Sequence, residues 1–210
     1  MKYINYYSSP LGKLLMAADD IGLTGLWFEN QLHYAYNLDP EHQEKELPVF
    51  KQTKQWLDLY FSGQKPDFTP PIHMTGTPFQ TAVWNILEQI PYGQTTTYGD
   101  IAAQIANQKG IAHMSAQAVG QAVGRNKISI IIPCHRVIGK NGTLTGYAGG
   151  LDKKTALLSI EKLFNLPTHN FLNYFFPIRD TDMLRLLVLI CLAGEQKRRN
   201  SFFGSSITVS

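Results

Sequence analysis

The sequence predicts an α+β protein in which an antiparallel sheet-and-helix domain precedes a mostly helical domain containing a helix-turn-helix. Short β-prone runs alternate with turn residues over the first part of the chain, and capped amphipathic helices fill its middle. A stiff, proline-rich connector at 65–71 separates these two patterns. We therefore expect domains at 1–74 and 75–165, followed by an extension at 166–210 of unknown role.

The first domain is expected to open with an antiparallel meander. Three runs of β-prone residues, at 3–7, 13–18 and 23–29, are separated by the turn residues of 8–12 and 19–22. This spacing of short apolar runs and turn signals is typical of strands joined by tight turns.

A helix should follow the meander. Apolar side chains repeat on one helical face over 48–61, namely Val49, Trp56, Leu57 and Tyr60. Gly63 and Pro66 then end the helix, and the domain boundary follows at the connector or just after it.

The second domain opens with two helix-start signatures. Thr77, Pro78 and Gln80 form a capping-box pattern with proline in the first turn. Thr97 and Asp100 repeat a similar pattern at the start of the next helix. Both predict helices whose first backbone amides are satisfied by side chains.

A third helix is predicted over 116–124, capped by Ser115 and ending at Arg125. Its alanine and glycine residues allow another molecule to approach its backbone closely. Two short helices joined by a turn predict a helix-turn-helix, although ordinary helical hairpins have the same pattern.

A candidate nucleophile follows. The β-branched run 128–132 predicts a buried strand or extended segment that leads to Pro133, Cys134 and His135. Only a thiolate attacks carbon well, and a neighbouring base or cation lowers the pKa of a thiol. Cys134 is therefore the expected nucleophile, with His135 beside it.

The last part of the second domain should be a helix. Asp152 is expected to cap it, after a loop rich in glycine. Its inward-facing residues are Ala156, Leu157, Ile160, Leu163 and Phe164. Glu161 lies on the adjacent stripe of the same helix.

Composition narrows the class of protein. The net charge is +3, and residues 75–165 hold eight Lys and Arg against four Asp and Glu, which suits a polyanionic partner or a solvated basic face. No run is long and apolar enough for a membrane span, and the N-terminus lacks a signal core, so we expect a cytoplasmic protein. Cys134 and Cys191 are expected to be free thiols, and no metal site is predicted.

The motifs together resemble the O6-alkylguanine-DNA alkyltransferases, also called methylated-DNA-protein-cysteine methyltransferases. The matching elements are the run Pro133-Cys134-His135-Arg136-Val137, Asn126, the run Gly146-Tyr147-Ala148-Gly149-Gly150, Tyr98 and Glu161. The resemblance covers about 77–164 in order and spacing. It implies a ribonuclease H-like N-terminal domain and a winged-helix-like second domain.

The resemblance also implies an activity. An alkyl group would pass from O6-methylguanine in duplex DNA irreversibly to Cys134 after base flipping, with O4-methylthymine as a second candidate substrate. His135 would take the thiol proton through a bridging water, Glu161 would stabilise the imidazolium, and the Tyr98 hydroxyl would donate to N3 of the base. Each molecule would act once, as a monomer without a cofactor or an obligate protein partner.

Further site residues follow from the same resemblance. The expected DNA-binding residues are Gln117, Ala118, Gly120, Arg125, Asn126 and Arg136. The expected pocket for the flipped base comprises Val137, Tyr147 and Ala148. Asn126 would in addition hold the turn between the recognition helix and the segment that carries the cysteine.

The chain departs from the family pattern in three places. Gln117 stands where the family commonly has an arginine finger, which predicts weaker duplex binding. The connection at 108–114 is longer, and the extension beyond Leu166 has no counterpart. Cys191 is expected to be a bystander hydrophobe.

Two other functions remain open on the sequence. A Cys-His hydrolase or acyltransferase would need an oxyanion hole and would turn over. A non-enzymatic module that binds alkylated DNA is a third hypothesis, but such proteins lack the cysteine that is present here at position 134.

Overall fold

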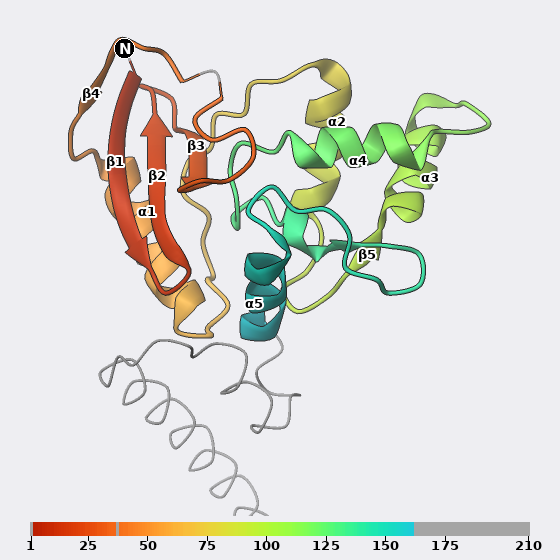
Figure 1. Ribbon diagram of the computed structural model, residues 1–210. Coiled ribbons are helices and arrows are strands. Elements are labelled where there is room, and N and C mark those ends of the chain that lie inside the picture. Colours follow the sequence, from red (N-terminus) through yellow and green to blue (C-terminus); the bar gives the residue numbers. More distant parts are fainter. Residues whose placement is uncertain (1, 37, 162–210) are drawn as a thin grey trace, which may run out of the picture. The chain divides into compact units, whose positions relative to one another are not determined.

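A computed structural model of the chain describes residues 2–36 and 38–161. Its N-terminal part contains a four-stranded sheet in the order β3-β2-β1-β4 (Figure 1). The strands are β1 (Lys2–Ser9), β2 (Gly12–Ala18), β3 (Leu23–Phe28) and β4 (His42–Glu44). The first three are antiparallel neighbours, so the expected meander is confirmed, and β4 pairs with β1 in parallel.

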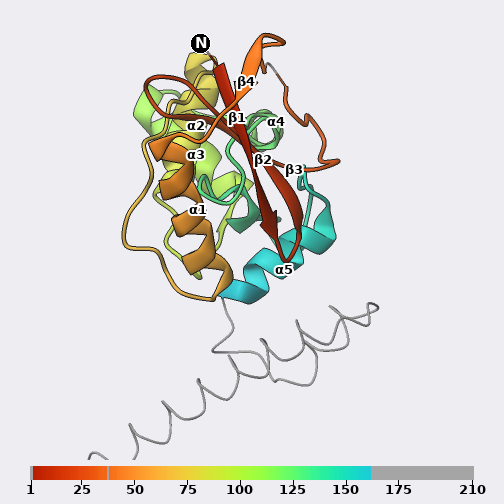
Figure 2. The same cartoon turned by 90° about the vertical axis from the view of Figure 1, so that its left-hand side faces the viewer.

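The two faces of this sheet bury different side chains. Because side chains alternate along a strand, Leu14 and Met16 of β2 point into the main core while Leu15 and Ala17 point to the opposite face. Helix α1 (Pro48–Phe61) lies against the core-facing side (Figure 2). Each large side chain buried in this way contributes about 1.5–3 kcal/mol to folding.

The outer edge of β3 pairs with two segments from later in the chain. Leu23 bridges Ile72, and Leu26 bridges Ile128. Backbone hydrogen bonds of 2.8 and 2.9 Å flank Leu26 on this edge. The edge strand is therefore covered, and the chain just before Cys134 is attached to the N-terminal sheet. The described residues accordingly belong to one compact unit.

Three helices build most of the second half (Figure 1). They are α2 (Pro78–Glu88), α3 (Tyr98–Lys109) and α4 (Ala116–Gly124). Thr77 and Thr97 form the capping boxes expected from the sequence, and the Ser115 side chain caps α4. The indole of Trp84 donates to Ala122 O at 2.9 Å and joins α2 to α4.

The run 128–132 does not form the expected strand. Beyond the bridge at Ile128 it turns back on itself, with Ile131 N donating to Ser129 O and Ile132 N to Ile128 O. Ile130 takes a φ of 70°, a left-handed conformation that is costly for a β-branched residue. Burial of the surrounding isoleucines outweighs this local cost.

The segments after the turn carry the thiol and the last helix. A short 3₁₀ helix, η1 (Cys134–Arg136), precedes β6 (Val137–Ile138), which pairs in parallel with β5 (Thr96–Thr97). Helix α5 (Leu151–Glu161) begins one residue before the expected cap, so Asp152 lies in its first turn. Leu163, Phe164, Cys191 and the extension fall outside the described residues.

Within residues 2–36 and 38–161, no helix has both the length and the hydrophobicity needed to cross a bilayer. In the same residues, no three His, Cys, Asp or Glu side chains are grouped so as to hold a metal ion.

Candidate active site

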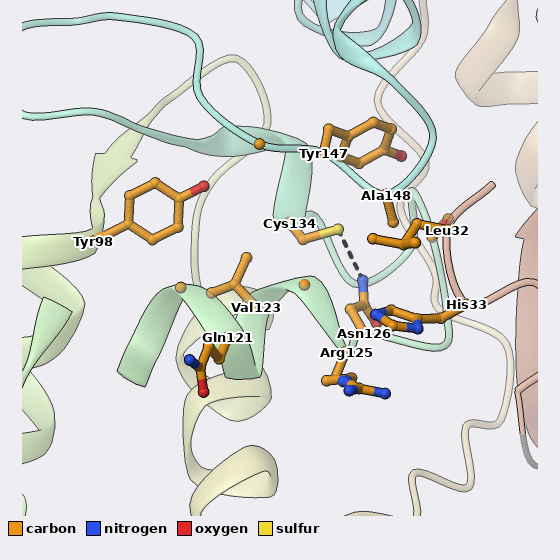
Figure 3. Close-up of a pocket in the computed structure, with 14 residues that line it drawn as sticks. Leu32, His33, Tyr98, Gln121, Val123, Arg125, Asn126, Cys134, Tyr147 and Ala148 are labelled. Carbon is orange, nitrogen blue, oxygen red and sulfur yellow. Dashed lines mark hydrogen bonds between the residues drawn. The ribbon is translucent and has the colours of Figure 1, made fainter. Parts of the chain in front are cut away.

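Cys134 faces a cavity of about 590 Å³ at the C-terminal end of α4. Figure 3 shows its sulfur between Tyr98 on one side and Asn126 and Ala148 on the other, with Tyr147 above. Cys134 is 7% exposed, so a reacting group must enter the cavity to reach its thiol.

Asn126 connects the turn after α4 to the cysteine. Its Nδ2 donates to Cys134 Sγ at 3.1 Å and to Ile132 O at 2.8 Å, while its Oδ1 accepts from Ile128 N at 3.0 Å. The turn-holding role expected for Asn126 agrees with these bonds. Its expected place on the DNA-binding surface does not, because the side chain is buried and its amide is engaged inside the protein.

Burial raises the pKa of the Cys134 thiol, although the Asn126 hydrogen bond and the charge of Lys154 partly counteract this. The resting side chain is therefore a thiol at neutral pH. A base must remove its proton before the sulfur can attack, and the Asn126 amide is placed to stabilise the resulting anion.

His135 and Glu161 form a buried pair. His135 Nε2 lies 2.6 Å from Glu161 Oε1, and both side chains are inaccessible to solvent. An ionised carboxylate fixes the proton on Nε2, which leaves Nδ1 as the basic nitrogen. Nδ1 has no hydrogen-bond partner among the described residues. Burial lowers the pKa of His135, with Glu161 opposing the shift, so the imidazole is neutral and can accept a proton.

Glu161 is held from several elements. Arg136 Nε donates to Oε2 at 2.9 Å, Gly93 N donates to Oε2 at 3.0 Å, and the Tyr60 hydroxyl donates to Oε1 at 2.9 Å. Burial alone would raise the pKa of Glu161, but His135 and Arg136 outweigh it and lower the pKa to about 2. Gly93 has a φ of 75°, which favours glycine at this contact.

Arg136 does not occupy the DNA-binding surface expected for it. Its guanidinium is buried against Glu161 and also donates to Ile90 O at 2.6 Å. Pairing with Arg136 offsets part of the cost of burying the Glu161 charge, because a buried charge without a partner is strongly destabilising. Arg136 therefore supports the site from inside.

Lys154 attaches the loop after β6 to the site. Its buried Nζ donates to Val137 O at 2.6 Å and to Thr145 O at 2.7 Å. Burial lowers the pKa of Lys154 to about 8, so it is still mainly charged at neutral pH. Val137, expected in the base pocket, is buried and does not line the cavity.

The remaining expected residues divide into two groups. Those that line the cavity are Tyr98, Gly120, Arg125, Tyr147 and Ala148. Gln117 and Ala118 lie on α4 outside the cavity, and Gln117 is exposed. Burial raises the pKa of the Tyr98 phenol, which therefore keeps its proton at neutral pH.

Sequence reasoning missed part of the cavity wall. Leu32 and His33, which follow β3, lie beside Ala148 and Asn126 (Figure 3). Leu32 N donates to Ala148 O at 2.8 Å. Nothing in the local sequence predicts this contact, because it joins segments more than 100 residues apart. Ser129, Gln121 and Gly124 also line the cavity.

The buried pair makes the protein sensitive to acid. The carboxyl of Glu161 has a pKa of about 2 when folded and a reference value of 4.5, so protonation favours the unfolded chain. Its stabilising effect is present above pH 4.5 and is lost as the pH falls toward 2, a change of about 3 kcal/mol. Because burial lowers the pKa of His135 below 6.5, the unfolded chain gains that proton first, which acts in the same direction.

Urea unfolding at a series of pH values measures this dependence. We expect the free energy of unfolding to fall steadily below about pH 6. A Glu161→Gln variant is expected to show a flatter curve below about pH 5, since the shifted carboxyl is absent. Equal slopes in the two proteins would assign the acid sensitivity to other groups.

Two family models match nearly all of the described chain. Residues 2–74 match the 6-O-methylguanine DNA methyltransferase, ribonuclease-like domain, and residues 78–163 match the DNA binding domain of the same family. The chain belongs to the 6-O-methylguanine DNA methyltransferase family. The expected fold class is confirmed as well.

Individual relatives in this methyltransferase family are similar over most of their length. The chain is 45% identical to a methylated-DNA--protein-cysteine methyltransferase of Haemophilus influenzae, over 77% of this chain and 87% of the relative. It is 42% identical to the constitutive enzyme of Bacillus subtilis, over 76% and 97%. The Mycobacterium tuberculosis OGT protein, solved in complex with DNA, is 40% identical with a TM-score of 0.67, over 77% of this chain and 93% of that one.

Proposed function

We propose that this protein repairs DNA by transferring a methyl group from O6 of guanine to Sγ of Cys134, once per molecule. The observation that carries the proposal is a buried thiol, Cys134, that faces a cavity. The next residue in the chain, His135, is paired with the buried carboxylate of Glu161. The names of the relatives support the reaction class, and the OGT complex supports DNA as the partner. O4-methylthymine is the second candidate substrate.

The reaction breaks one bond and forms another. As the carbon of the methyl group leaves O6, it bonds to Cys134 Sγ, and the thiol proton passes to His135 Nδ1. The structure gives no direct Cys134–His135 hydrogen bond within the described residues, so a bridging water is proposed to carry the proton. Glu161 stabilises the imidazolium that results.

The leaving guanine develops negative charge that must be neutralised. Tyr98 lines the cavity and keeps its phenolic proton, so its hydroxyl is the proposed donor to N3 of the base. Tyr147 and Ala148 form the opposite wall. The guanine anion takes up a proton and the His135 imidazolium gives its proton back to solvent, so the products are neutral guanine in the DNA and an S-methylcysteine, which has no leaving group to regenerate the thiol.

The depth of the thiol requires the base to leave the duplex. Flipping costs a few kcal/mol, less for a base whose pairing is already weakened. The small residues of α4, with Gly120 at the cavity wall, are proposed to let the sugar-phosphate backbone approach. Arg125 is exposed at the end of α4, beside the cavity entrance, and is a proposed phosphate contact.

Gln117→Arg is expected to tighten binding to duplex DNA severalfold at fixed salt. The residue is exposed on α4, and an added cation there neutralises a phosphate or pairs with the orphaned base. Fluorescence anisotropy across a salt series should give a slope of log affinity against log salt that is steeper by about one.

Gln55→Arg is the matched control, because it adds the same charge at an exposed position of α1. It should change affinity much less. Equal tightening by the two variants would mean that overall charge, and not the position on α4, determines binding.

The proposed function is tested with an oligonucleotide duplex carrying O6-methylguanine. Peptide mass spectrometry should find one added methyl group, on Cys134, with a yield that stops at one per protein molecule. Turnover of an ester substrate would favour the hydrolase hypothesis instead. Tight lesion binding without methyl transfer would favour the binding-module hypothesis.

Three further features are proposed. The cavity, the thiol and its supporting pair all lie within one chain, which supports action as a monomer. The two matched segments support the predicted domains at 1–74 and 75–165. A cytoplasmic location is proposed because DNA is the substrate.

A further inference from the structure

Tyr60 brings a hydroxyl from the N-terminal domain to the buried pair. Its side chain is completely buried, and its OH donates to Glu161 Oε1 at 2.9 Å. The Tyr60 hydroxyl oxygen also lies 3.4 Å from His135 Nε2. Oε1 thus accepts from both the imidazole and the phenol, from partners 26 and 101 residues away in sequence.

The ring of Tyr60 is fixed on three sides. It stacks on Trp56 at 5.3 Å and meets the rings of Tyr92 and His135 edge to face at 6.0 and 6.4 Å. An aromatic side chain packed in this way has little freedom to rotate, so its hydroxyl is held at one place. The ring and the hydroxyl together restrict both the imidazole and the carboxylate.

We propose that Tyr60 is a positioning residue for methyl transfer, which holds Glu161 and His135 in the geometry that leaves His135 Nδ1 free to accept the Cys134 proton. This inference rests on the proposed function and extends it to the N-terminal domain. Helix α1 thus positions the groups of the proton relay in addition to supporting the fold.

The hydroxyl acts in two ways. It adds a donor to Oε1, the carboxylate oxygen that His135 contacts and that Arg136 Nη2 also reaches at 3.0 Å, while Arg136 Nε and Gly93 N hold Oε2 at 2.9 and 3.0 Å. It also withdraws some of the negative charge that Glu161 would otherwise direct at the imidazole. Hydrogen bonds to a buried charged group are stronger than neutral ones, so its loss should be measurable.

Three charged side chains act on His135, and the Tyr60 hydroxyl lies beside it. Glu161 and Lys154 come from α5, Arg136 from η1, and Tyr60 from α1. Removing the Tyr60 hydroxyl leaves the other three unchanged. The negative charge of Glu161 then acts more strongly on the imidazole, and the protonated form of His135 becomes easier to populate.

Tyr60→Phe tests the proposal because it removes only the oxygen atom. In single-turnover methyl transfer from an O6-methylguanine duplex, the rate constant is expected to fall about tenfold. The acidic limb of the pH–rate profile should move to higher pH, since the neutral imidazole is the form that accepts the proton. Loss of packing alone would lower the rate constant without this shift of the pH–rate profile.

Tyr7→Phe is the matched control. The Tyr7 hydroxyl also donates to a carboxylate, Asp58 Oδ1 at 2.7 Å, and Asp58 lies on α1 two residues before Tyr60. Tyr7 has no contact with the His135–Glu161 pair in the described residues. The control should keep both the wild-type rate constant and the wild-type pH midpoint.

A second measurement does not depend on DNA. The rate at which iodoacetamide labels Cys134, followed by peptide mass spectrometry, reports on thiol ionisation, and Tyr60→Phe should shift its pH midpoint while Tyr7→Phe should not. The proposal is overturned if the pH midpoint of iodoacetamide labelling is the same in Tyr60→Phe as in the wild-type protein, whether or not the rate constant of methyl transfer or the melting temperature falls. If the wild-type protein labels normally but never takes up a methyl group, the proposed function fails while the labelling still decides the role of Tyr60.

Discussion

Cys134→Ala is expected to abolish methyl transfer completely. No other described side chain in the cavity offers a soft nucleophile, and displacement at a methyl carbon needs one at neutral pH. The variant should still fold, because Asn126 keeps its bonds to Ile128 and Ile132 when the sulfur is removed. We expect a stability loss of about 1 kcal/mol or less.

The measurement is the loss of O6-methylguanine from a duplex under single-turnover conditions. Cys134→Ala should leave the lesion intact while binding the duplex as tightly as the parent protein, because the other residues that line the cavity are unchanged. Cys191→Ala is the matched control and should repair at the parental rate. Repair by Cys134→Ala at an undiminished rate would exclude the proposed reaction.

Glu161→Gln is expected to have the second largest effect, on both stability and activity. The substitution leaves the Arg136 guanidinium buried without a counter-charge, and removing one partner of a buried ion pair costs about 3–5 kcal/mol. A glutamine keeps one oxygen, which accepts up to two hydrogen bonds, but its NH2 group places donors where Arg136 or Gly93 also donates. At least one buried donor is therefore left unsatisfied.

Activity should fall by a factor of about 100 or more, because the imidazolium formed during transfer loses its counter-charge. Chemical denaturation measures the stability change, and transfer is compared at a temperature at which both proteins are folded. Glu88→Gln on α2 is the control, since Glu88 is exposed and its substitution should change stability by about 0.5 kcal/mol or less. A Glu161→Gln protein as stable and active as the control would remove Glu161 from the relay.

The helices of the second half could be predicted because their signals are local. Thr77 with Gln80, and Thr97 with Asp100, form their capping boxes within one turn, so four consecutive residues contain the whole interaction. The meander was predictable for a similar reason, since its turns join adjacent strands. The prediction for 128–132 was wrong because the conformation of Ile130 depends on burial and on the edge of β3, neither of which local propensity contains.

The site was predictable only in part. The resemblance placed Cys134, His135 and Glu161 together, and the structure has His135 and Glu161 in direct contact. It also placed Arg136 and Asn126 on the DNA-binding surface, whereas both have their polar groups turned inward. A motif specifies which residues are near the reaction, but not the direction in which each side chain points.

The sequence by itself determined the helix starts and the family and predicted the candidate nucleophile, because each depends on residue types at short, fixed spacings. The tertiary structure decided which groups surround the nucleophile. Tyr60 on α1, Gly93 after α2 and Leu32 after β3 reach the site from segments that are distant in sequence. Such contacts form only when the sheet, α1 and α5 pack together. They matter because a buried carboxylate or thiolate has lost its hydration, so its charge is stabilised only by the hydrogen-bond donors that the fold places around it.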